Sequence, residues 1–270
     1  MKAVALSEAN VIASLFASFA PLLVGWFAQS LGWRWALGMV LCTPLVMWFG
    51  LGKNSSLVNT SSDSDVHPSR GSLPTLFWIY WVAIVLGVSV EFCMIFWSAD
   101  YLEQTLALSK ANAAQAVSLF LAAMIVGRIL GSRLVQRFPT RLVVTISILI
   151  AGIGFLLFWK ADNTFLGLSG LFITGLGVAN LYPLILSLAI SSANGNTVQA
   201  GARATLASGT AILALPLALG WLADAIEIRS AYGIVLVLLI SVFLINQLAG
   251  NHTHKQPAHR SSHFSRLMVV

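Results

Sequence analysis

Eight long runs of apolar residues constrain the fold of this chain more than any other feature of its sequence. Each run is about 20 residues long, which is enough for an α-helix to cross the hydrocarbon core of a bilayer. Apolar residues make up 58% of the 270 residues and charged residues 9%, whereas soluble proteins carry about 25% charged residues. We therefore predict an all-α polytopic membrane protein. Its helices are expected over residues 9–30, 33–51, 75–98, 113–135, 140–159, 165–191, 200–223 and 231–249.

The basic residues predict how these helices are oriented in the bilayer. Eight spans place both termini on one side, and that side carries eleven Lys and Arg residues against four on the other. Because cytoplasmic loops are enriched in Lys and Arg, both termini are predicted to be cytoplasmic. The net charge of +6 is spread between the apolar runs without a basic stripe, so the expected partner is the lipid bilayer and no nucleic acid.

Two segments of the chain, one on each side of the helix at 75–98, share a gapless pattern. PLLVGWFAQSLGWR begins at Pro21 and PLALGWLADAIEIR begins at Pro216, 195 residues later. The even number of helices between them makes both copies cross the membrane in the same direction, which predicts a parallel repeat. Chance similarity between Leu- and Ala-rich helix ends is the alternative. The residues that carry the repeat are Pro21, Gly25, Arg34, Pro216, Gly220, Asp224 and Arg229.

Together with three further motifs, this repeat makes the chain resemble the major facilitator superfamily. The stretch GRILGSRLVQRFPTR, residues 127–141, is similar to the basic loop motif between family helices 8 and 9, although Gln136 stands where the family often has Asp. GWLAD from Gly220, GLGVANLYP from Gly175 and EFCMIFWSADYLE from Glu91 resemble parts of family helices 11, 10 and 7. The loop-motif residues are Gly127, Arg128, Gly131, Arg133, Arg137 and Arg141.

The resemblance implies a domain organisation and a function. It matches the eight helices to family helices 5 to 12, so that the chain is truncated at its N-terminus and lacks helices 1 to 4. Residues 1–51 are then the last two helices of the N-terminal half, 52–74 a cytoplasmic linker, 75–250 the six-helix C-terminal half and 251–270 a disordered cytoplasmic tail. The implied activity is secondary transport of a sugar-like or small polar solute, with alternating access around a midplane site, in the inner membrane of a bacterium.

Four residues are candidates for a substrate or proton pathway. Glu91 lies inside an apolar run, where a carboxyl group is costly unless it is paired, protonated or in contact with a wet cavity. It could carry a coupling proton or bind substrate, or it could be a structural carboxyl near the outer interface. Asn180 and Tyr182, before Pro183, could bind a polar solute or join helices. Trp97, with Tyr101, could stack on a sugar ring or belong to the interfacial aromatic belt.

Other functions lack a sequence signal. No nucleophile–base arrangement, zinc-protease motif or phosphate-binding loop occurs, so an enzyme is not predicted and no cofactor or metal is expected. Two alternatives to solute uptake remain open. One is efflux of a drug or another hydrophobic compound, and the other is a transport-inactive fragment or membrane interaction protein.

Overall fold

The computed structural model describes Gly38 and residues 72–254, and within this part of the chain it contains helices and no strands. Apart from Gly38, the first two predicted helices lie outside the described residues. So do the first copy of the repeat with Pro21, Gly25 and Arg34, most of the predicted linker and the tail beyond residue 254. The described helices are α3 Thr75–Leu106, α4 Lys110–Val135, α5 Thr140–Trp159, α6 Thr164–Val178, α7 Leu181–Ser191, α8 Thr197–Ile226, α9 Ile228–Ala231 and α10 Gly233–His254.

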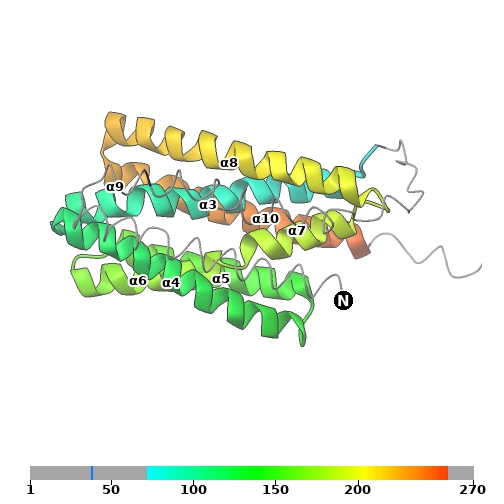
Figure 1. Cartoon of the computed structure of the whole chain (residues 1–270), viewed down its shortest axis with the longest axis horizontal. Coiled ribbons are helices and arrows are strands. Elements are labelled where there is room, and N and C mark those ends of the chain that lie inside the picture. Colours follow the sequence, from blue (N-terminus) through cyan, green and yellow to red (C-terminus); the bar gives the residue numbers. More distant parts are fainter. Residues whose placement is uncertain (1–37, 39–71, 255–270) are drawn as a thin grey trace, which may run out of the picture. The chain divides into compact units, whose positions relative to one another are not determined.

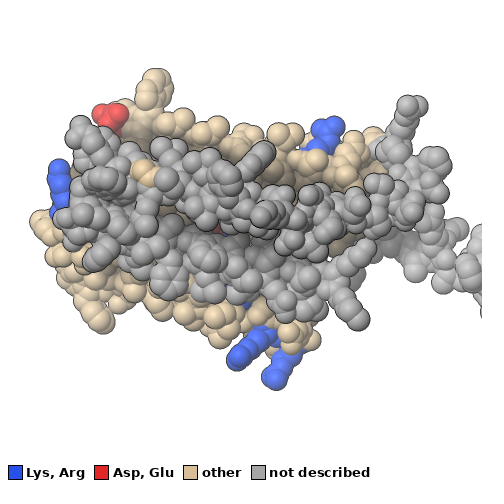
Figure 2. All heavy atoms as spheres, in the orientation of Figure 1, with Lys and Arg blue, Asp and Glu red and all other residues tan. Residues whose placement is uncertain are grey.

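Six of the segments formed by these helices are long and apolar enough to cross a membrane, which confirms the predicted all-α membrane fold for the described residues. They lie side by side along one direction (Figure 1). On the face shown in Figure 2, the visible charged side chains of the described residues lie toward the two ends of the helices. The six segments are Thr75–Leu106, Lys110–Val135, Thr140–Trp159, Thr164–Ser191, Thr197–Ile226 and Ile228–Gly250.

Side-chain hydrogen bonds cap the starts of α4 and α6. The Ser109 hydroxyl accepts the Asn112 N–H at the start of α4, and the Asn163 side chain accepts the Leu166 N–H at the start of α6. Ala107, at φ 53°, ends α3 in the left-handed conformation. The prediction that this helix ends at residue 98 is wrong, because the chain beyond it continues the helix to Leu106 and buries Tyr101 and Leu102 in the core.

Glycines allow α5 and α6 to pack with their main chains in close contact. A Cβ atom added at Gly177 would collide with the main-chain nitrogen of Ala151, and one at Gly170 with that of Phe158. Small residues of this kind let membrane helices approach each other closely. The glycines of α6 therefore serve helix packing.

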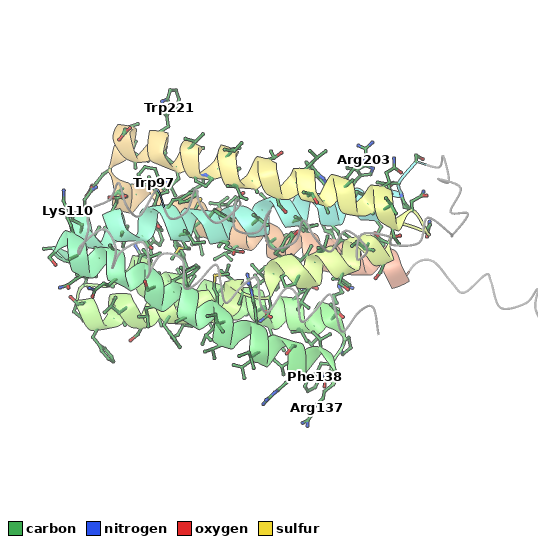
Figure 3. All side chains as sticks on the ribbon, viewed as in Figure 1. Trp97, Lys110, Arg137, Phe138, Arg203 and Trp221 are labelled. Carbon is green, nitrogen blue, oxygen red and sulfur yellow. The ribbon has the colours of Figure 1, made fainter. Side chains whose placement is uncertain are left out.

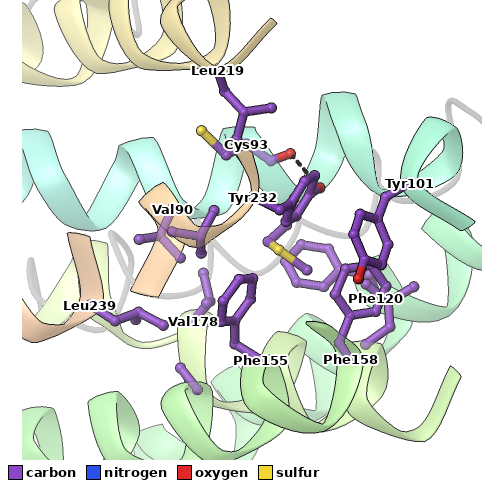
Figure 4. Close-up of a cluster of buried hydrophobic side chains, with 14 of the residues drawn as sticks. Val90, Cys93, Tyr101, Phe120, Phe155, Phe158, Val178, Leu219, Tyr232 and Leu239 are labelled. Atoms are coloured by element: carbon purple, nitrogen blue, oxygen red, sulfur yellow. Dashed lines mark hydrogen bonds between the residues drawn. The ribbon is translucent and has the colours of Figure 1, made fainter. Parts of the chain in front are cut away.

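An aromatic cluster fills the core where α3, α5 and α10 meet (Figure 4). Tyr101 is 1% exposed and its hydroxyl donates to the Trp159 carbonyl over 2.7 Å. The Tyr232 hydroxyl donates to the Cys93 carbonyl over 3.1 Å, which is the dashed line in Figure 4. Tyr101 is therefore packed in the core of the described residues, and both readings of it, sugar stacking and the interfacial belt, stay predictions.

Candidate functional site

The predicted helix over residues 165–191 is interrupted, and this break organises the candidate site. α6 ends at Val178 and α7 begins at Leu181, with Asn180 as its N-cap residue. Pro183 lies in the first turn of α7, where its missing N–H leaves the Ala179 carbonyl without the usual helical donor. α6 packs mainly on α5 and α4, whereas α7 packs mainly on α3. The break therefore moves the chain from one pair of neighbours to another (Figure 1).

The break between α6 and α7 packs against two glycines of α4. A Cβ atom at Gly127 would lie 2.5 Å from the Leu176 carbonyl oxygen, and one at Gly131 would collide with the Asn180 side chain. Asn180 is 7% exposed, and its Nδ2 donates to the Gly127 carbonyl over 2.9 Å. Gly127 and Gly131 of the predicted basic loop motif thus lie inside α4 and form a contact surface for the start of α7.

Arg128, between these glycines, faces Glu91 of α3. Arg128 Nη2 lies 3.8 Å from Glu91 Oε1, and the two side chains are 33% and 14% exposed. Arg128 Nε donates to the Ala179 carbonyl over 3.5 Å. The sequence prediction assigned Arg128 to the cytoplasmic loop motif, whereas the structure places it on α4 beside the carboxyl group that the sequence singled out.

The depth of this ion pair can be estimated from helix geometry. At about 1.5 Å per residue, Glu91 lies about 24 Å along α3 from Thr75 and about 22 Å from Leu106. Arg128 lies about 10 Å before the end of α4 at Val135. Both side chains therefore belong to the membrane-spanning parts of their helices, where ionisable groups are costly and are usually paired. Such a pair can take up a proton at the carboxylate or exchange its contacts for a polar solute.

The described contacts of Trp97 and Tyr182 are with residues other than Glu91 and Arg128. Trp97 Nε1 donates to the Pro216 carbonyl over 2.9 Å, and a Cβ atom at Gly220 would collide with the Trp97 ring. Figure 3 shows Trp97 pointing toward α8. Tyr182 is half-buried against the hydrophobic cluster of α3, α7 and α8. The second copy of the predicted repeat thus uses Pro216 and Gly220 to join α8 to α3.

The remaining basic residues of the two motifs lie at the helix ends. Arg141 donates from Nη2 to the carbonyls of Asn246 and Gln247 over 2.7 and 2.8 Å, which joins α5 to α10. Arg133 and Arg137 are exposed, and Figure 3 shows Arg137 pointing away from the helices. At the opposite end Arg229 lies 3.5 Å from Asp162, while Asp224 is exposed.

Two features of the described residues bear on ligands. A hollow of about 520 Å³ lies near Ser109, Asn112 and Thr164 at the end of the helices away from the α4–α5 turn, and Glu91 does not line it. The residues that the structure describes contain no group of three or more His, Cys, Asp or Glu residues that could hold a metal ion.

Comparisons with known proteins agree with this fold. The sequence profile of the Major Facilitator Superfamily matches residues 2–193 and residues 79–265. An uncharacterised MFS-type transporter of Yersinia pestis is 28% identical over 172 residues, covering 61% of this chain and 44% of that protein.

Solved structures share the arrangement of helices. The transporter FucP in its outward conformation aligns with a TM-score of 0.60 at 18% identity, over 82% of this chain and 54% of FucP. A variant of the E. coli fucose:proton symporter FucP aligns with a TM-score of 0.67 at 18% identity, over 81% of this chain and 57% of that protein. The chain thus spans about half the length of these relatives. Because the profile matches most of its residues, the chain belongs to the major facilitator superfamily.

Proposed function

We propose that this protein takes part in proton-coupled transport of a small polar solute, with Glu91 as the group that carries the proton. The observation that carries the proposal is the Glu91–Arg128 contact inside two membrane-spanning helices. Intramembrane ionisable residues commonly mark substrate or proton pathways. A sugar-like solute is the substrate class we favour, since FucP, which shares the fold, is described as a fucose:proton symporter.

The chemistry follows from the charge of the pair. A proton that binds the Glu91 carboxylate neutralises it, and the attraction across the 3.8 Å to Arg128 is lost. The proton's departure restores the ion pair. If the two access states of the transporter differ in the distance between α3 and α4, protonation shifts the population between them. The proton and the solute then move together because both bind the state in which this contact is loosened.

We further propose the inner membrane of a bacterium as the site of this activity, with the α4–α5 and α7–α8 turns in the cytoplasm. One observation supports this orientation, and a second supports the kind of membrane. Arg133, Arg137, Arg141 and Arg203 are at that end of the described helices, against Lys110, Lys160 and Arg229 at the other, in the direction expected from the excess of cytoplasmic Lys and Arg. The relative from Yersinia pestis supports a bacterial membrane.

Replacing Glu91 tests the proposed proton role. We expect Glu91→Gln to reduce uptake driven by a proton gradient at least tenfold in proteoliposomes, because glutamine keeps the size of the side chain but cannot bind the proton. The matched control is Glu103→Gln, on the same helix, whose carboxylate lies 3.9 Å from Lys110 near the helix end. Gradient-driven uptake that persists in Glu91→Gln at the level of Glu103→Gln would contradict the proposal.

A further inference from the structure

The α6–α7 break presents a carbonyl group to α4. In the main chain of α7, Leu184 N–H donates to the Asn180 carbonyl over 3.2 Å, so that the helical bonds of α7 begin at Asn180. The preceding carbonyl, of Ala179, would normally accept from residue 183, which is a proline and has no N–H. Arg128 Nε donates to this carbonyl over 3.5 Å. The position of Pro183 therefore leaves an acceptor where the guanidinium group can use it.

A second contact holds the break against the residue next to Arg128. The buried Asn180 amide donates to the Gly127 carbonyl over 2.9 Å, and Gly131 provides the space for the Asn180 side chain. The backbone of α4 is thereby attached to α7 one residue before Arg128. This hydrogen bond fixes the position of the Arg128 main chain relative to the Ala179 carbonyl. The orientation of the guanidinium group therefore depends on it.

From these contacts we infer that Pro183 and Asn180 are positioning residues that set the Arg128 guanidinium against Glu91. The inference rests on the proposed function, in which the Glu91–Arg128 contact is the working part. A guanidinium group donates in several fixed directions, so Nε can bond Ala179 while Nη2 faces Glu91. A lysine ammonium carries all its donors on one atom, so it does not reproduce the separate Nε and Nη2 donor positions. Pro183 acts only through the carbonyl that it leaves open.

A double-mutant cycle on the purified full chain tests this inference. We expect Arg128→Lys to lower the melting temperature by several degrees in the native background. In the Pro183→Ala background we expect less than half of that loss, because the main-chain N–H gained at position 183 then bonds the Ala179 carbonyl and the arginine has already lost this contact. The matched control is Pro216→Ala, a second proline inside a helix, α8, which is expected to leave the cost of Arg128→Lys unchanged.

A spectroscopic readout separates positioning from simple stability. The infrared band of the Glu91 carboxyl group is identified as the band that Glu91→Gln removes. Among the described residues Arg128 is the charged group within 4.0 Å of Glu91. We therefore expect Pro183→Ala to displace the midpoint pH of this band, and Pro216→Ala to leave it in place. Asn180→Ala, which removes the donor to Gly127, is expected to displace it too.

The outcomes distinguish this inference from the proposed function, because neither readout requires transport. Additive effects of Pro183→Ala and Arg128→Lys, together with an unmoved Glu91 band in both Pro183→Ala and Asn180→Ala, would overturn the positioning role. Absence of proton-coupled uptake by the native chain, with the coupling and the band displacement present, would overturn the proposed function and leave the positioning of Arg128 intact.

Discussion

At the scale of single residues, Glu91 and Arg128 differ from the other ion pairs of the described residues in their burial. Their side chains are 14% and 33% exposed, whereas Lys110 and Glu103 are 87% and 36% exposed. Exposed pairs contribute little to stability because water and salt screen them, while a pair removed from water is costly to break. We therefore expect the Glu91–Arg128 pair to affect the free energy of unfolding more than the exposed pair of Lys110 and Glu103.

This difference predicts unequal effects of two Gln substitutions. We expect Arg128→Gln to lower the free energy of unfolding by about 1–3 kcal/mol, because it removes the charge that faces Glu91. Lys110→Gln, the exposed control, is expected to change it by less than about 0.5 kcal/mol. Thermal unfolding in detergent measures both, and equal effects of the two substitutions would show that the pair at Glu91 has no special weight.

At the scale of helices, the contacts of α6 explain why part of the fold could be predicted and part could not. Apolar runs about 20 residues long predicted the membrane spans. Pro183 indicates a bend in this helix, but the end of α6 at Val178 was not predicted. A proline in the sequence shows only that one helical hydrogen bond is missing. The contacts at the break lie between distant parts of the chain, since Asn180 bonds to Gly127 and Ala179 to Arg128, both on α4.

The packing of α5 on α6 predicts the effect of two Gly→Ala substitutions. Gly177→Ala is expected to destabilise the protein by about 1–3 kcal/mol, since its methyl group would meet the main chain of Ala151. At Gly152, on α5, nothing lies within 4 Å of an added Cβ atom, so Gly152→Ala is expected to be neutral or stabilising by up to about 1 kcal/mol. Unfolding of both variants in the same detergent provides the comparison, and a tolerated Gly177→Ala would refute the tight packing.

At the scale of the whole molecule, the sequence predicted the family and the membrane fold but not the contacts of the candidate site. Glu91 could be singled out because a lone carboxylate in an apolar run is conspicuous. Its partner could not, because Arg128 lies in a stretch that also resembles a basic loop, and only the pairing of α3 with α4 brings the two together. Similarly, the pattern at Pro216 and Gly220 predicted a repeat without indicating that Trp97 packs on it.

The orientation of the molecule predicts the labelling of two surface positions. In a background without Cys42 and Cys93, we expect Lys110→Cys to react with an impermeant thiol reagent from outside the cell. Arg137→Cys is expected to react only after the membrane is permeabilised, because the excess of Lys and Arg assigns the α4–α5 turn to the cytoplasm. Figure 3 shows Lys110 and Arg137 toward opposite ends of the helices, so reaction of both from the same side would refute the membrane topology.

Proton movement driven by a solute tests the central claim of this account most directly. Purified protein in proteoliposomes with an internal pH indicator would be exposed to a panel of sugars, other small polar solutes and hydrophobic compounds, without an imposed proton gradient. We predict that a polar solute drives protons across the membrane in the same direction as its own uptake, and that Glu91→Gln abolishes this flux. Solute uptake without any accompanying proton movement, or the same flux in Glu91→Gln, would contradict the account.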